Sequence, residues 1–333
     1  MMAGRLFFDK PIESSSEFSE IASLFTDHWS IHESVYLGEV PNVTLRVSAE
    51  PGPPAVRVYN NGYATDEHLA LEIAYLRRLS KVDCPWSPHI FDGLDGSTVQ
   101  HWRGYRVIAM KLLPGNLADE VDVDPLNCYK VGAEIARLTC DLGEFEYSVS
   151  DDNSFWRRSE RLLRKLSPDM AESVWGLDVD ALAEQLEGAS TFVRAMFADV
   201  GLIPTDIWSP NVLIYNQRLS GIVDFDDMAL DPRYLDIAAA LSKFAAYSNL
   251  NLDNARFRAM IDGYRSEHGP FAVRVVDALV TGVVVCYVSW LACNALHGVP
   301  FVESAVYIDR LRVLQDSALR ERFRTQIMHA MEG

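Results

Sequence analysis

Three polar residues in the second half of the chain have the types and spacing that phosphoryl transfer requires. Asp206 is followed five residues later by Asn211, and Asp224 comes after a further apolar run. A carboxylate can accept or orient the proton of an attacking hydroxyl, while an amide and a second carboxylate hold magnesium ions that neutralise charge on the transferred phosphate. We therefore predict Asp206 as the catalytic residue and Asn211 and Asp224 as metal ligands. The alternative is an acidic loop that is only solvated, but it leaves the two spacings unexplained.

The residues around this motif predict a β-hairpin. Residues 211–215 and 222–225 are short apolar runs, residues 216–218 between them are polar, and Gly221 opens the second run. Asn211 then opens one strand and Asp224 closes the other, so the two predicted metal ligands meet at one end of the hairpin. Magnesium keeps water and substrate phosphate among its ligands, so one amide and one carboxylate are enough.

The composition is that of a globular protein with room for two domains. The chain has 333 residues, of which 49% are hydrophobic and 23% charged. Its net charge of −17 repels nucleic acid and anionic membranes, so we exclude both as main partners. The same charge would suit a cationic substrate, although solubility alone explains it.

Cysteine usage and the N-terminus predict a cytoplasmic protein. The five cysteines include no Cys-x-x-Cys pair, which fits neither a disulfide framework nor a zinc site. The first residues contain no long apolar core. Residues 278–296 carry no charge and are long enough to cross a bilayer. Thr281, Ser289 and Asn294 and the lack of flanking Lys or Arg clusters favour a buried helix, with membrane attachment as the alternative.

Strands dominate the first third of the chain and helices the rest. The patterns predict strands at 34–38, 43–47, 55–59 and 105–113, and helices at 16–28, from 65, 124–142, 155–166, 179–200, 235–244 and over most of the remainder to about 330. The turn at 113–116 predicts a boundary between an N-terminal nucleotide-binding lobe, 1–113, and a C-terminal catalytic and acceptor-binding lobe, 114–333.

A buried acid in the N-terminal part needs a partner. Glu72 lies between Leu69 and Leu76 on the apolar face of the helix that starts at Thr65. Arg57, in the preceding strand, is the natural candidate. In kinases such a pair holds a basic residue against the nucleotide phosphates; the alternative is an ion pair that only stabilises the lobe.

These residues resemble a known family. The run 206–211, followed by 219–227, by Asp231-Pro232 and by 236–238, resembles the aminoglycoside phosphotransferase family, which includes choline kinase-like and homoserine kinase-like enzymes. Residues 42–45, 55–59 and 72–76 resemble its second strand, third strand and following helix, and 132–138 its first helix after the hinge. The resemblance spans about 34–265. It implies an α+β, bilobal, protein-kinase-like fold, with an N-terminal antiparallel sheet and one key helix, and a larger, mostly helical C-terminal lobe that carries the catalytic hairpin.

The resemblance also implies roles for individual residues. Asp206 would be the catalytic aspartate, and Asn211 and Asp224 the magnesium ligands. Arg57 would contact the nucleotide phosphates and Glu72 would hold it. Further nucleotide contacts are expected at Asn42, Met110 and Leu112, and structural support of the catalytic loop at Asp236. Expected acceptor contacts are Asp226, Asp227, Trp208, Tyr264, Tyr287 and Trp290. The preferred alternative for the two acids is that they hold the loop and bind water or metal, and aromatic residues at such positions are more often core.

Two positions depart from the family's pattern. Thr205 precedes the catalytic aspartate near the place where the family usually has histidine, and Arg57 replaces the usual lysine. Arginine keeps the charge but adds bulk and a planar fork, so the two residues are not equivalent.

The expected function is magnesium-dependent transfer of the γ-phosphate of ATP, with GTP as an option, to a hydroxyl of a small molecule. The acceptor would be an aminoglycoside or other antibiotic, an amino alcohol or a homoserine-like compound, and a cationic acceptor is one option. We expect a monomer or a homodimer without nucleic-acid or membrane partners. The alternative is a catalytically weak or inactive kinase-like protein that binds nucleotide and acts through a partner.

Overall fold

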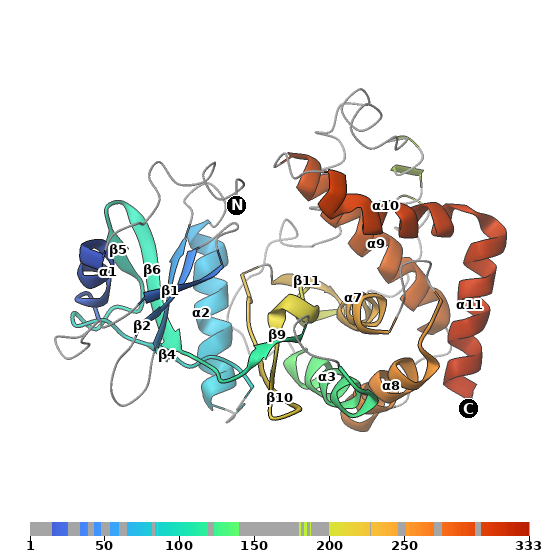
Figure 1. The fold of residues 1–333 in the computed structure, drawn as a ribbon, viewed down its shortest axis with the longest axis horizontal. Helices are drawn as coiled ribbons and strands as arrows, with labels where there is room; N and C mark the ends of the chain where they lie inside the picture. Colours follow the sequence, from blue (N-terminus) through green and yellow to red (C-terminus); the bar gives the residue numbers. More distant parts are fainter. Residues whose placement is uncertain are drawn as a thin grey trace. The chain divides into compact units, whose positions relative to one another are not determined.

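The chain forms two compact units (Figure 1). The computed structural model describes residues 15–25, 34–38, 43–47, 54–59, 65–81, 84, 86–118, 123–139, 180, 183–184, 187, 200–226, 228–245, 251–269, 275–296 and 301–332. The first unit comprises 1–116, 213–216 and 220–226, and the second comprises 117–212, 217–219 and 227–333. The functional division into lobes at residue 113 stays a prediction.

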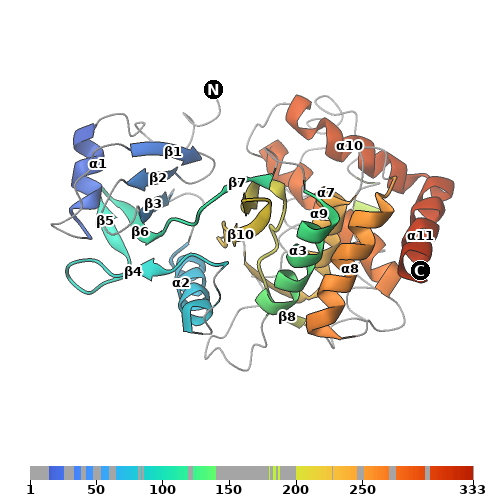
Figure 2. The same ribbon diagram turned by 60° about the horizontal axis from the view of Figure 1, so that its bottom comes forward.

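The first unit is built on an antiparallel sheet of six strands. The strand order is β1 (Ser34–Gly38), β2 (Val43–Val47), β3 (Pro54–Tyr59), β6 (Tyr105–Lys111) and β4 (Ile90–Phe91), and β5 (Gln100–Trp102) also pairs with β6 (Figure 2). The sequence predicts β1 and β2 with these bounds, and β3 and β6 to within two residues. The two-residue strand β4 has too few residues to show a pattern.

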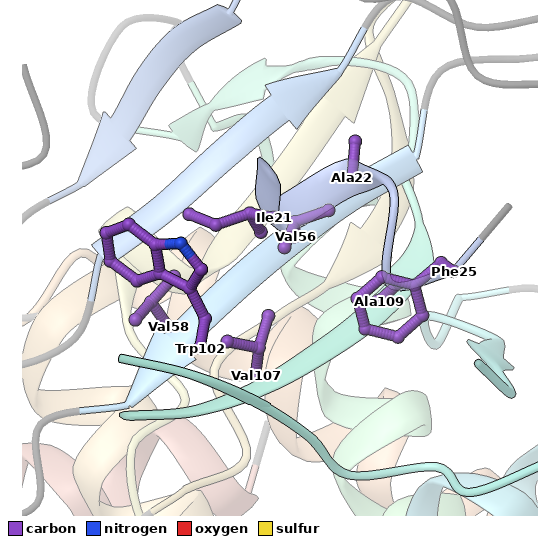
Figure 3. Packing of buried hydrophobic residues seen from close by; sticks show 8 residues of the cluster. All are labelled: Ile21, Ala22, Phe25, Val56, Val58, Trp102, Val107 and Ala109. Carbon is purple, nitrogen blue, oxygen red and sulfur yellow. The ribbon is translucent and has the colours of Figure 1, made fainter. Parts of the chain in front are cut away.

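Alternation along β3 and β6 gives the sheet two buried faces. Val56 and Val58 on β3 and Val107 and Ala109 on β6 face helix α1 (Ser15–Ala22) and the turn after it, with Ile21 and Phe25 in contact (Figure 3). The predicted helix at 16–28 is therefore shorter, because the chain turns at 23–25. The position of Phe25 against the sheet holds this turn.

The other face of the sheet packs against α2 (Asp66–Lys81). Leu69 of α2 belongs to one buried cluster with Ala55, Tyr59, Ile108 and Met110. Leu112 is partly buried against the same cluster. Arg57 shares this face with Tyr59, because residues two apart on a strand point the same way.

The predicted hairpin is formed by β9 (Val212–Tyr215) and β10 (Arg218–Ile222), in a sheet of order β10-β9-β7 with β7 (Asn116–Leu117). Asn216 and Gln217 have φ of 50° and 60°, as a two-residue hairpin turn requires. The turn is thus shorter than predicted, and Arg218 belongs to the second strand. Asp224 does not close β10 but lies two residues beyond it, with φ of 70°.

The second unit is mostly helical in its described part. It contains a two-stranded antiparallel sheet, β8 (Val200–Ile203) with β11 (Ala229–Pro232), and the helices α3 (Pro125–Leu138), α7 (Tyr234–Phe244), α8 (Asn254–His268), α9 (Val275–Leu296), α10 (Phe301–Gln315) and α11 (Ser317–Glu332). Asp124 caps α3 instead of belonging to it, because its carboxylate accepts from the backbone N–H of Asn127. The predicted helix at 155–166, most of that at 179–200 and residues 140–142 lie outside the described residues.

Two features fix how these helices pack. Gly132 of α3 and Gly263 of α8 face backbone atoms of the opposite helix, so the two helices lie side by side at backbone distance (Figure 2). In α9, Leu279, Val285 and Val288 are at most 1% exposed, so this helix is buried, as the sequence favours. In the described part of the chain, no helix is long and apolar enough to span a membrane.

Candidate active site

The loop that carries Asp206 is shaped by a short 3-10 helix. The loop leaves β8 at Ile203 and enters β9 through the 3-10 turn Ser209–Asn211. The backbone N–H of Asn211 donates to the carbonyl of Trp208 at 2.9 Å and closes this turn. Ile207 is buried beneath the loop and anchors it to the second unit. The turn thereby brings together two side chains that are five residues apart.

The Asp206 and Asn211 side chains are in direct contact. The amide nitrogen of Asn211 donates to the Asp206 carboxylate oxygen Oδ2 at 2.8 Å and to the Asp206 backbone carbonyl at 2.9 Å. Because the nitrogen makes both bonds, the amide oxygen points elsewhere and keeps its lone pairs for a cation. The five-residue spacing therefore places the Asp206 and Asn211 side chains within hydrogen-bonding distance.

Asp236 supports the residue immediately before Asp206. Its Oδ1 accepts a hydrogen bond from the Thr205 backbone N–H at 2.7 Å, and both residues are buried. Thr205 has φ of 65°, a left-handed conformation that a β-branched residue adopts only when neighbours enforce it. Burial, together with the Asp206 and Asp231 carboxylates, raises the pKa of Asp236, although the Thr205 N–H acts to lower it. The Asp236 bond fixes this loop conformation.

A residue outside the motif holds the hairpin turn. The Asn127 side chain, on α3, donates from Nδ2 to the Gln217 carbonyl at 3.0 Å and accepts at Oδ1 from the Leu219 N–H at 3.1 Å. Asn127 is buried, and it satisfies two backbone groups of the turn with one amide. No local pattern indicates this role, because the two partners lie 90 and 92 residues further along the chain.

Arg57 and Asp224 meet in the first unit. Arg57 Nη2 donates to Asp224 Oδ1 at 2.6 Å and to Asp226 Oδ2 at 2.9 Å. Burial opposes ionisation of both Arg57 and Asp224, but their mutual attraction raises the pKa of Arg57 and lowers the pKa of Asp224. Asp226, predicted as an acceptor contact, is used here as a partner of Arg57. The Asp224 side chain remains 30% exposed.

The predicted partner of Arg57 is different in the structure. Glu72, 2% exposed, accepts a hydrogen bond at Oε2 from the Tyr59 hydroxyl at 2.8 Å, whereas the ion pairs of Arg57 are with Asp224 and Asp226. Tyr59 lies on the same face of β3 as Arg57, toward α2, and its hydroxyl donates to the Glu72 carboxylate, so Glu72 already has a partner. Glu72 still acts on Arg57 at longer range, since its charge helps to raise the pKa of Arg57.

The aromatic residues predicted to line the acceptor site divide into two kinds. Tyr264 and Tyr287 are 0% exposed and belong to the core, which is the alternative that the sequence leaves open. Trp208 and Trp290 are half-buried and lie together around Lys243. Sequence reasoning missed Lys243, because nothing in the pattern of α7 separates it from an ordinary surface lysine. Of the predicted site residues, Asn42 and Asp227 lie outside the described residues.

The donor atoms suit magnesium and a nucleotide. The Asn211 amide oxygen in the second unit and the Asp224 carboxylate in the first unit are each hard oxygen ligands of the kind that magnesium prefers. Among the described residues, no group of three or more His, Cys, Asp or Glu is arranged to hold a metal. The buried Nε of Arg57 has no hydrogen-bond partner, and a phosphate oxygen would satisfy it.

A model of the phosphotransferase enzyme family matches residues 37–267. The chain belongs to this family. The match includes Asp206, Asn211, Asp224 and Asp236, and it begins before β2, so the phosphotransferase family accounts for the hairpin and for most of the first unit's sheet.

Curated relatives within the phosphotransferase family include homoserine kinases. The homoserine kinase of Methylobacillus glycogenes is 26% identical over 205 residues, which is 60% of this chain and 62% of the relative. That of Neisseria meningitidis serogroup B is 28% identical over 140 residues, covering 41% and 43%. The chain thus spans less than two thirds of the length of these relatives.

Solved phosphotransferases share the fold along nearly the whole chain. A spectinomycin phosphotransferase in complex with ADP and spectinomycin has a TM-score of 0.64 and 13% identity, covering 96% of this chain and 95% of that one. A microcompartment-associated aminopropanol kinase has a TM-score of 0.64 and 18% identity, covering 91% and 98%. Plasmodium vivax ethanolamine kinase has a TM-score of 0.66 and 16% identity, covering 92% and 89%. The fold is therefore the bilobal α+β fold of protein-kinase-like enzymes.

Proposed function

We propose that this phosphotransferase transfers the γ-phosphoryl group of ATP, with magnesium, to a hydroxyl group of a small molecule. The observation that carries the proposal is the contact between Asp206 and Asn211, at 2.8 Å. This contact orients a carboxylate for proton transfer and an amide oxygen for metal binding on a single loop. Spectinomycin, aminopropanol and homoserine, the compounds in the relatives' names, are all small molecules with hydroxyl groups, which supports the acceptor class.

Each residue has a defined part in the proposed reaction. Asp206 accepts the proton of the acceptor hydroxyl as the hydroxyl oxygen attacks the γ-phosphorus, and the bond from the γ-phosphorus to the bridging oxygen breaks to release ADP. Arg57 holds phosphate oxygens through its charge and its unsatisfied Nε. Asn211 and Asp224 would hold magnesium, which neutralises charge on the phosphates when bound. Asp236 keeps Thr205, and with it Asp206, in place through the backbone bond at 2.7 Å.

The experiment is an ADP-release assay with ATP, magnesium and a panel of amino alcohols, homoserine, aminoglycosides and peptide antibiotics. We expect acceptor-dependent ADP release that Asp206→Asn lowers by about 10²–10⁴-fold, because the amide cannot take a proton. Asn at 206 keeps an oxygen for the Asn211 amide, so nucleotide affinity should persist. The control is Asp309→Asn, an exposed acid on α10, which should leave the rate unchanged. An unchanged rate in Asp206→Asn would refute the assignment.

A second candidate function follows from the Arg57–Asp224 ion pair. A guanidinium bound to the proposed metal ligand favours a kinase-like protein that binds nucleotide without turnover. This reading predicts thermal stabilisation by ATP that is the same with and without magnesium, and no ADP release on any acceptor. Magnesium-dependent stabilisation would support the enzyme instead.

A further inference from the structure

The second unit contains three aromatic rings around one ammonium group. The Nζ atom of Lys243, near the C-terminal end of α7, lies 4.2 Å from the ring centroid of Trp208, 4.1 Å from that of Trp290 and 4.0 Å from that of Tyr307. The rings come from the loop after Asp206, from α9 and from α10. We call these three residues the aromatic cage. The Lys243 ammonium also donates a hydrogen bond to the Tyr307 hydroxyl.

An arrangement of this kind binds cations. The face of an aromatic ring carries partial negative charge and attracts a cation within about 6 Å of its centroid. Several such rings around one point form the site by which proteins recognise organic ammonium ligands. Here the bound cation is part of the chain itself.

Contacts that do not involve Lys243 hold two of the three rings of the cage, Trp290 and Tyr307. Tyr287 packs against both Trp290 and Tyr307, with ring centroids 5.9 Å apart in each case. Arg310 donates to the Tyr287 hydroxyl at 2.9 Å and to the Ser242 carbonyl at 2.7 Å. These bonds tie α9 and α10 to the residue immediately before Lys243. Trp290 and Tyr307 should therefore stay in place when the lysine side chain is shortened.

Nearby acidic groups also favour a cation in this region. Burial and the carboxylates of Asp236, Asp206 and Asp231 raise the pKa of the Cys286 thiol on α9, while the Lys243 ammonium lowers it. The charge of Lys243 and the charges of the three acids thus shift the pKa of the Cys286 thiol in opposite directions. Removal of the lysine charge would leave the cage in a more negative environment.

We propose that Lys243 is a specificity-determining residue that fills the aromatic cage beside the catalytic loop and thereby excludes organic cations from it. Lys243, Trp208, Trp290 and Tyr307 are half-buried, so each of the four residues keeps some contact with solvent. As a statement about substrate class, the inference rests on the proposed function: the acceptor presents a neutral or anionic group, and no ammonium group, to this site. As a statement about binding, it rests on the cage alone.

The test measures binding of tetramethylammonium to nucleotide-free protein, by tryptophan fluorescence and by calorimetry. Lys243→Ala should bind this probe saturably, with an affinity at least about tenfold above that of the wild type, since the vacated cage gains a desolvated cation–π site. Lys243→Arg keeps a cation in the cage and should show no gain. Sodium chloride at equal ionic strength controls for screening.

Two further variants keep the result decisive. Lys243→Gln retains most of the side-chain stem and should also gain affinity, so it replaces the alanine variant if that variant does not fold. Trp290→Leu added to Lys243→Ala should abolish the gain. Equal affinity of wild type, Lys243→Ala and Lys243→Gln would overturn the proposal, and so would a gain that survives Trp290→Leu. No phosphoryl transfer enters this measurement, so a failed ADP-release assay counts against the proposed function alone.

Discussion

Arg57 of β3 and Asp224, two residues beyond β10, form a direct ion pair of 2.6 Å in the first unit. The pair joins the residue expected to contact nucleotide phosphates to a residue expected to bind magnesium. The Arg57 side chain is 8% exposed, and its Nη2 also lies 2.9 Å from Asp226 Oδ2. One guanidinium therefore compensates two neighbouring carboxylates, which would otherwise repel each other.

The first prediction concerns the loss of this cation. Arg57→Ala should lower the free energy of unfolding at pH 7 by about 2–4 kcal/mol, because it leaves two acids together with reduced solvation. The pKa of Asp224 in the folded state is depressed, so its stabilising contribution is present above the unfolded value and is lost as the pH falls through the folded one. The deficit of the variant should thus stay constant from pH 7 down to about pH 4 and shrink as the pH falls further.

Urea unfolding at several pH values measures this effect. The control is Arg77→Ala, which removes an exposed pair with Asp92 in the same unit and should cost at most about 1 kcal/mol. Arg57→Lys keeps the charge but has one ammonium in place of a fork, so its stability should lie between wild type and Arg57→Ala. A pH-independent deficit in Arg57→Ala would contradict the ion-pair explanation.

The second prediction concerns the hydroxyl of Tyr59. Tyr59→Phe removes the donor to the buried Glu72 carboxylate and should cost about 1–3 kcal/mol of stability. In the double variant Tyr59→Phe/Glu72→Gln the loss should be smaller than the sum of the two single losses, because both changes act on one contact. Tyr215→Phe, at an exposed tyrosine of β9, is the control and should change nothing. Additive losses would show that the two residues are not coupled.

The third prediction is a pH dependence that belongs to Asp236. Its folded-state pKa is raised above the unfolded value by burial, so the folded protein binds more protons between the two values and stability falls as pH rises through that window. Asp236→Asn cannot titrate and can still accept from Thr205. The stability of this variant relative to wild type should rise from pH 4 to pH 8, by up to about 1.4 kcal/mol per pH unit. Asp262→Asn, at an exposed acid of α8, should show a flat difference; a flat difference for Asp236→Asn would refute the raised pKa.

The fourth prediction concerns the close packing of α3 and α8. A Cβ atom at Gly263 would lie 1.8 Å from the Tyr129 carbonyl oxygen. This oxygen belongs to the backbone of α3, so it cannot rotate away as the end of a side chain can. Gly263→Ala should therefore cost at least about 3 kcal/mol by urea unfolding, in spite of the better helix propensity of alanine. Asp262→Ala, one residue away on the exposed side, should stay within about 0.5 kcal/mol of wild type. A stable Gly263→Ala variant would mean that the helices are further apart.

The sequence by itself determined the contact between Asp206 and Asn211 and several of the elements. The bond between Asp206 and Asn211 is local, made by one 3-10 turn, so the spacing of five residues already contained it. Strands β1 and β2 and the start of α2 were also readable, because apolar alternation and a capping position are properties of short segments.

Only the tertiary structure decided which side chains meet across long stretches of chain. The sequence placed Arg57 and Glu72 near each other, but Asp224 lies 167 residues after Arg57 and reaches it through a turn with positive φ. Likewise, the lysine of α7 meets rings from three other segments, and no periodicity in any one segment predicts that meeting. Local propensity fixes elements, whereas the partners of a buried charge are fixed by which elements pack together, since burial makes an unpaired charge too costly.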